Sequence, residues 1–180
     1  MWVGVLGDRK DDHLLARVEA ALMLIRRYDP LKYKRLHRDI KRIWVHSLSG
    51  AQGQFTSASG TCRLDYKFVE TAPAEFIAST IVHEATHAHP CMRKLGYPEA
   101  LRYRIERVCM RRELDFTSRL PDGAAAHESV ERNLSRERSF WSDDAFNQRN
   151  EVALRDFGFP EWSIRVLFGL KEIVKRFRRP

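Results

Sequence analysis

The sequence of 180 residues contains few cysteines and no long apolar run. Its three cysteines, Cys62, Cys91 and Cys109, are odd in number and widely spaced, which excludes a fully paired disulfide framework and a Cys-x-x-Cys motif. No stretch reaches the roughly 18 consecutive apolar residues that a membrane-spanning helix needs. Residues 1–12 have too short an apolar run, followed by acidic residues, for a secretory signal peptide. We therefore expect a soluble protein of the reducing cytoplasm.

Acidic residues are in the minority. The chain has 24 Asp and Glu against 32 Lys and Arg, which gives a net charge of +8 and a pI near 9.7. Such an excess attracts nucleic acid, anionic lipid or acidic proteins, and it does not specify a fold. Apolar residues make up 43% of the chain, which is enough for one hydrophobic core at this length. Since we find no internal repeat, we predict a single domain over residues 1–180.

Hydrophobic periodicity predicts several helices. The C-terminal segment, "EWSIRVLFGLKEIVKRFRRP", is both amphipathic and basic. Asp29-Pro30 is expected to end the first helix, and Pro90 the second. Four segments carry apolar residues at helical spacing: residues 11–27, 73–90, 98–120 and 161–180.

Two other segments have the composition of strands. "RIWVHSL", which begins at Arg42, is β-branched and aromatic, and apolar residues alternate in "TCRLDYKFVE", residues 61–70. The turn-forming residues between them predict two strands joined by a long hairpin connection. Residues 121–150 are polar and have little periodicity, so we expect a mostly exposed connection with at most one short helix. The predicted fold class is α+β, with a short antiparallel sheet.

The most informative stretch is "IVHEATHAHP", residues 81–90, in the second half of a predicted helix. His83 and His87 are four positions apart and project to the same side of a helix, so both imidazoles can reach one ion. Glu84 borders the same face. In H-E-x-x-H sites the glutamate takes a proton from the zinc-bound water, which attacks a polarised carbonyl. The spacing therefore predicts His83 and His87 as zinc ligands and Glu84 as general base.

A catalytic zinc site needs a third protein ligand. Glu99, Glu106 and Glu113 are spaced by seven and fall along one stripe of the following helix. If the two helices fold back near residue 93, the level of the histidines lies near residues 100–104, and Glu113 lies roughly 15 Å too far along the axis. Glu99 occupies the first turn, where a carboxylate already suits the helix dipole, whereas Glu106 has apolar neighbours and should face inward. We predict Glu106 as the third ligand and keep Glu99 as the alternative.

With these residues the sequence resembles the gluzincin class of zinc metallopeptidases, in which an H-E-x-x-H helix precedes a helix with a glutamate ligand. The matching residues are "HEATH", 83–87, and Glu106 within "RIERVCMRRELDF", and the resemblance covers roughly Lys41 to Leu120. The sequence is also similar to compact SprT-like and other small zincin domains, some of which act on proteins near DNA. The resemblance implies a small zincin-like domain that hydrolyses peptide bonds with one zinc ion.

The resemblance also implies two features of the substrate site. The strand before the active-site helix, here Cys62 to Val69, would form the edge of the cleft and bind an extended peptide by backbone pairing. A Tyr, His or Arg side chain would stabilise the oxyanion, and the sequence does not choose among His89, Tyr97, Tyr103 and His127.

The excess of basic residues supports a second hypothesis, a non-catalytic nucleic-acid-binding module. A peptidase recruited to nucleic acid would combine the two. The basic segment 161–180 either packs on the domain, which is the favoured interpretation, or contacts anionic membrane or nucleic acid. We assign no chemistry to the cysteines, because isolated cysteines are most often small buried side chains.

Overall fold

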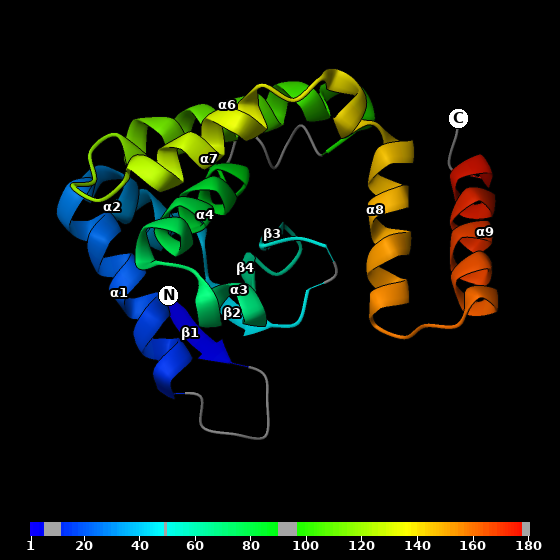
Figure 1. The fold of residues 1–180 in the computed structure, drawn as a ribbon, viewed down its shortest axis with the longest axis horizontal. Helices are drawn as coiled ribbons and strands as arrows, with labels where there is room; N and C mark the ends of the chain where they lie inside the picture. The colour runs from blue at the N-terminus through cyan, green and yellow to red at the C-terminus, as the bar shows by residue number, and fades with distance from the viewer. Residues whose placement is uncertain (6–11, 49, 90–96, 178–180) are drawn as a thin grey trace.

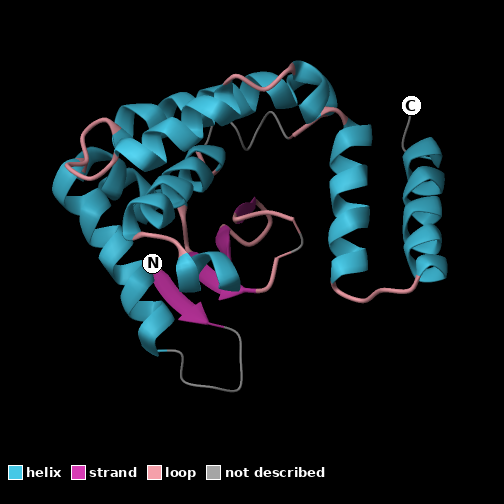
Figure 2. Cartoon of the chain, viewed as in Figure 1, coloured by secondary structure: helices cyan, strands magenta, loops and turns pink. Residues whose placement is uncertain are grey.

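The computed structural model describes residues 1–5, 12–48, 50–89 and 97–177, and they form an α+β fold dominated by helices (Figures 1 and 2). The strands are β1 Trp2–Val5, β2 Arg42–His46, β3 Gly53–Thr56 and β4 Thr61–Asp65. The helices described before residue 90 are α1 Asp12–Tyr28, α2 Pro30–Asp39, α3 Tyr66–Thr71 and α4 Ala74–His87. Those after it are α6 Glu99–Thr117, α7 Ala124–Leu134, the 3-10 turn η1 Arg138–Trp141, α8 Asp143–Asp156 and α9 Glu161–Phe177.

The four strands form one mixed sheet in the order β1-β2-β4-β3. β1 pairs with β2 and β2 with β4 in parallel, and only β3 runs antiparallel to its neighbour β4. The predicted hairpin between residues 42–48 and 61–70 and the predicted antiparallel sheet are therefore wrong. The chain between β2 and β4 contains β3, which turns back along the far side of β4.

The strand predicted over Cys62 to Val69 is shorter and lies elsewhere in the sheet than expected. β4 ends at Asp65, because the Asp65 carboxylate accepts a hydrogen bond from the Phe68 amide at 3.0 Å and starts α3. β4 also lies between β2 and β3, so both of its edges are already paired. The sheet edge nearest α4 is β3, which has more contacts with α4 than β4 does.

The core holds α4 between α1 and α6, the two helices with which it has its most extensive contacts. Leu14, Val18 and Ile25 of α1 and Ile77 and Ile81 of α4 are inaccessible to solvent, as their helical spacing predicts. Burying each side chain of this size stabilises the fold by about 1.5–3 kcal/mol relative to exposure. This packing fixes the face of α4 that carries the H-E-x-x-H residues.

Several elements were not predicted from the sequence. Asp29-Pro30 ends α1, as predicted, and also begins α2, since the Asp29 carboxylate accepts from the Lys32 amide at 2.9 Å and proline fits a first helical turn. β1 was not predicted. The expected exposed connection over 121–150 is wrong, because most of it is helical, and α7 buries Ala126 and Val130 against α6.

The C-terminal helix α9 contacts α8, and the two stand side by side at one end of the molecule (Figure 1). α8 is attached to α6 through Arg102, whose guanidinium lies 2.7 Å from the Asp143 carboxylate. Ile164 of α9 is buried, whereas Trp162 and Val166 are 71% and 53% exposed. None of the helices in the described ranges combines the length and the apolar character that a bilayer crossing needs.

Candidate metal centre

The two predicted imidazole ligands point to one place on α4. The Nε2 atoms of His83 and His87 lie 3.2 Å apart, and the ring centroids are separated by 5.0 Å. This proximity follows from the helical repeat, since positions four apart lie one turn above each other. Both side chains are largely shielded from solvent, with 16% and 15% of their surface exposed.

Glu106 of α6 joins the two histidines. Its Oε2 lies 3.1 Å from His83 Nε2, and its Oε1 lies 3.4 Å from His87 Nε2. The Tyr97 phenol donates a hydrogen bond to the same carboxylate. The structure thus brings the three residues predicted as ligands together, from two helices that pack side by side.

A sulfur atom lies at the same point. Cys109 Sγ is 3.6 Å from His87 Nε2, and donor atoms of His83, His87 and Cys109 all lie within 4.8 Å of one another. Cys109 is fully buried, one helical turn after Glu106 on the inward face of α6. We did not predict its proximity to the histidines, although its spacing of three from Glu106 was visible in the sequence.

The separations between these donor atoms fit a metal ion. In a tetrahedral zinc site, bonds of about 2.0–2.1 Å to nitrogen or oxygen and about 2.3 Å to sulfur put two such N or O donors about 3.3 Å apart, and nitrogen and sulfur about 3.6 Å apart. The observed N–N and N–O separations are 3.1–3.4 Å, and the N–S separation is 3.6 Å. The residues present therefore fit a small divalent transition metal.

Glu113 fixes the orientation of His83. Its Oε2 lies 2.9 Å from His83 Nδ1, and its Oε1 accepts a hydrogen bond from Ser79 Oγ at 2.9 Å. A carboxylate can only accept, so His83 Nδ1 donates to Glu113, and a metal that took the place of the Nε2 proton would find this nitrogen already directed at the cluster.

The predicted distance of roughly 15 Å between Glu113 and the histidines is wrong. The contacts of Ser79 with Glu113 and of His87 with Glu106 place the histidines level with residues 106–113, not with residues 100–104. The reason is that the first turns of α6 extend past the C-terminal end of α4, toward α8 (Figure 1). A symmetric fold-back near residue 93 does not describe this offset.

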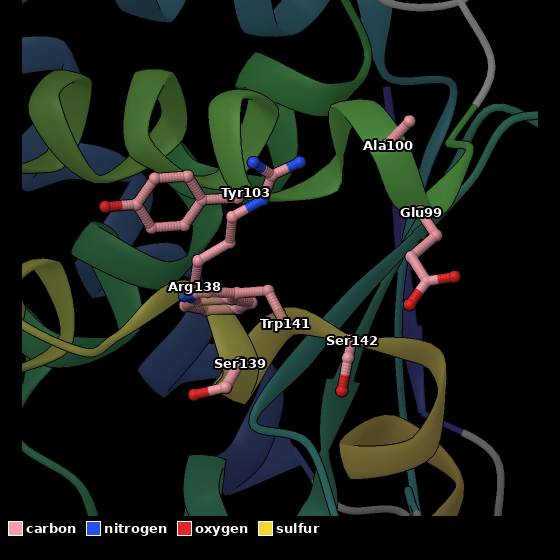
Figure 3. A pocket seen from close by; sticks show the side chains of 7 residues that line it. All are labelled: Glu99, Ala100, Tyr103, Arg138, Ser139, Trp141 and Ser142. Atoms are coloured by element: carbon pink, nitrogen blue, oxygen red, sulfur yellow. The ribbon is translucent and has the colours of Figure 1, made fainter.

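Glu99, the alternative third ligand, lies in that extension. Its carboxylate accepts a hydrogen bond from the Asp143 amide at 2.9 Å, at the N-terminus of α8. It lines a pocket of about 440 Å³ together with Tyr103, Arg138 and Trp141, and Figure 3 shows its carboxylate on the side near Ser142. This position gives Glu99 a role in holding α8 to α6.

Glu84 lies on the side of α4 that faces β3. A Cβ atom on Gly53 would come within 2.6 Å of Thr80 Cγ2 and 3.2 Å of Glu84 Oε1, so only glycine allows this close approach of strand and helix. Glu84 is 7% exposed. Burial raises the pKa of its carboxyl above the usual value, against the opposing effect of His83 and His87.

The charges of the site are strongly coupled. Burial lowers the pKa of His83, but Glu113 and Glu106 outweigh it and hold this pKa well above its usual range. Burial also acts to lower the pKa of His87, yet hydrogen bonds with Cys109 and Glu106 raise it to about 10. Burial acts to raise the pKa of the Glu106 carboxyl, but its hydrogen bonds to the two histidines outweigh burial and hold this pKa well below the usual value. A bound metal cation would balance the negative charge of the Glu106 carboxylate, which in the metal-free protein stabilises the protonated imidazoles.

Of the four residues considered for oxyanion stabilisation, Tyr97 is the one that the described contacts place at the cluster. Its ring meets the His87 ring edge-on, with centroids 5.7 Å apart. Tyr103 accepts a hydrogen bond from Arg107, His127 pairs with Thr117, and His89 lines a separate pocket of about 490 Å³ beside α2.

Three comparisons of the chain with known proteins found no match. No family model matches it, and neither the curated proteins nor the solved structures contain a significant match.

Proposed function

We propose that this protein is a zinc-dependent metallopeptidase, with zinc held by His83, His87 and Glu106 and with Glu84 as general base. The observation that carries the proposal is the convergence of two imidazole Nε2 atoms and one buried carboxylate within 3.1–3.4 Å. Nitrogen, oxygen and sulfur donors at these separations suit zinc better than magnesium or calcium, which prefer oxygen alone.

The residues of the chain would divide the work of hydrolysis. When bound, zinc supplies Lewis acidity that polarises a carbonyl and lowers the pKa of water. With a metal bound, Glu113 would accept from His83 Nδ1 and so keep Nε2 as the binding nitrogen, and the Tyr97 phenol orients the Glu106 carboxylate. Glu84, with its raised pKa, is suited to accept a proton at one step and return it at the next.

The proposed substrate is an extended segment of a peptide or protein. β3 is the outer strand of the sheet, and its backbone pairs with β4 on one side. An extended peptide can add to the other side by backbone hydrogen bonds, which places it beside Glu84 because Gly53 lies against that carboxylate. β3 takes over the role that the resemblance gave to Cys62 to Val69.

The test combines metal analysis with Glu84→Gln. We expect wild-type protein to contain zinc at a stoichiometry near one and to degrade a fluorescently labelled unfolded protein. Glu84→Gln should keep the zinc and lose hydrolysis. Glu75→Gln, in the first turn of the same helix, is the matched control and should keep both. Wild-type protein without metal, or undiminished hydrolysis by Glu84→Gln, would refute the assignment.

A second proposal concerns the basic C-terminal helix, which we infer binds an anionic membrane surface. The exposed apolar residues Trp162, Val166 and Leu170 are spaced by four and form one stripe of α9. Residues 161–180 contain six basic and two acidic residues, an excess of four positive charges. An exposed apolar stripe in a segment with net positive charge suits a lipid interface, whereas nucleic acid needs the cations alone. Steeply salt-dependent nucleic-acid binding that ignores chelators would favour the rival module instead.

A further inference from the structure

We propose that Cys109 is a fourth protein donor to the metal of this site and that it keeps the resting hydrolase latent. The inference rests on the proposed function, because it concerns the same metal, and it adds a means of control.

The position of Cys109 supports the ligand role. Its sulfur lies 3.6 Å from His87 Nε2, the separation of about 3.6 Å expected for nitrogen and sulfur on one tetrahedral zinc. Glu106 and Cys109 are three positions apart on α6, so both side chains leave the helix on one face, and each contacts His87 Nε2. Thiolate sulfur is among the preferred ligands of zinc.

A comparison with Cys62 separates ligation from simple burial. Both thiols are fully inaccessible to solvent, which is typical of cysteine as a small apolar side chain. Cys62 lies in β4 and is not one of the clustered donors, whereas Cys109 lies close enough to His83 and His87 to share a metal ion with them. Burial alone does not require a cysteine to face two imidazoles.

A fourth donor has a functional consequence. Catalytic zinc sites have three protein ligands and keep one position open, whereas sites with four protein ligands are closed. With Cys109 bound, His83, His87, Glu106 and Cys109 would supply the four protein ligands of a closed site. On binding, the Cys109 thiol releases its proton to solvent and its sulfur forms the bond to the metal. Withdrawal of this sulfur reverses both changes and opens the position that hydrolysis requires.

The experiment uses cobalt(II) in place of zinc in the full chain. Thiolate ligands of cobalt give a charge-transfer absorption in the near ultraviolet that nitrogen and oxygen ligands do not give. We expect this band in wild-type protein and in the double variant Cys62→Ala, Cys91→Ala, in which Cys109 is the remaining cysteine. Cys109→Ala should bind cobalt without the band.

The spectra test whether Cys109 is a ligand even if the Cys109→Ala variant is unstable. A cobalt-loaded double variant without the band overturns it, as does a band that survives in Cys109→Ala. If Cys109→Ala does not fold, the double variant decides alone, because its band can arise from Cys109 only. Wild-type protein that binds no cobalt overturns this inference and the proposed function together.

Hydrolysis tests latency separately. At saturating zinc, Cys109→Ala should degrade the labelled unfolded protein on the order of tenfold faster than wild type, which corresponds to about 1.4 kcal/mol in favour of the closed site. An equal or lower rate, with the band lost, overturns latency and leaves the ligand role standing. If neither protein hydrolyses substrate while the spectra behave as expected, the peptidase proposal falls and Cys109 remains a ligand.

Discussion

Glu113→Gln isolates the contact that orients His83. The carboxylate accepts two hydrogen bonds, from Ser79 Oγ and His83 Nδ1, both at 2.9 Å. Glutamine has nearly the same shape but only one acceptor oxygen beside its amide donor. If that oxygen keeps the bond from Ser79, the amide donates to Nδ1 and the imidazole proton moves to Nε2. The proton then points at the metal position.

The expected loss of metal affinity follows from the position of Glu113, which contacts the proposed ligand His83 and not the metal itself. Loss of such an outer partner typically reduces metal affinity about 10–100-fold. This range corresponds to about 1.4–2.7 kcal/mol of binding free energy. Because Glu113 is 8% exposed, solvent does not readily replace the missing acceptor. We therefore expect a loss within this range and not a smaller one.

The assay is a competition titration of zinc between the protein and a chromophoric chelator. It measures the dissociation constant directly, and this constant reports the orientation of His83 as long as the metal-free variant stays folded. Ser79→Ala is the matched control, since it removes the other partner of Glu113 and leaves the contact with His83. A wild-type dissociation constant for Glu113→Gln, or an equal loss for Ser79→Ala, would show that Glu113 does not orient the ligand.

Three further predictions concern pH, the core and the membrane surface. Folding raises the pKa of His87 from 6.5 to about 10. The stability that the protonated His87 adds to the metal-free protein is therefore complete below pH 6.5 and is lost as the pH rises toward 10. Melting temperatures should fall across this pH range in the wild type and change less in His87→Ala. Phe116→Ala should lower the free energy of unfolding by about 3–5 kcal/mol, because Phe116 is fully buried. Phe157→Ala, at an exposed position, should lower it by less than about 0.5 kcal/mol, and urea denaturation measures both changes. Trp162→Asp should reduce co-sedimentation with phosphatidylserine vesicles, while Met23→Asp, at an exposed site on α1, should not; unchanged sedimentation of Trp162→Asp would contradict the α9 proposal.

The group of His83, His87 and Glu106 illustrates what a local pattern can place. His83, Glu84 and His87 occupy one helix, so their relative positions depend on a fixed local repeat. The placement of Glu106 on the inward face of the next helix rested on the same repeat and on its apolar neighbours. The N-terminal helix was predicted over 11–27 and observed as Asp12–Tyr28 for the same reason.

The contacts of Cys109 and Glu113 were beyond that reasoning. Both depend on how far α6 slides along α4, and an error of one or two turns moves a side chain by about 5–11 Å. The parallel pairing of β1, β2 and β4 was missed for a related reason, because it joins segments far apart in the sequence and has no local turn to reveal it.

The sequence by itself determined the helices α1, α4, α6 and α9 and the pair of imidazoles on α4, since each depends on residues within a few turns of one another. The tertiary structure decided which acids and which thiol meet those imidazoles and which strand borders Glu84. These outcomes depend on the register between α4 and α6 and on the order of strands in the sheet. Both are set by packing across the whole core, where every buried side chain contributes and no local pattern dominates.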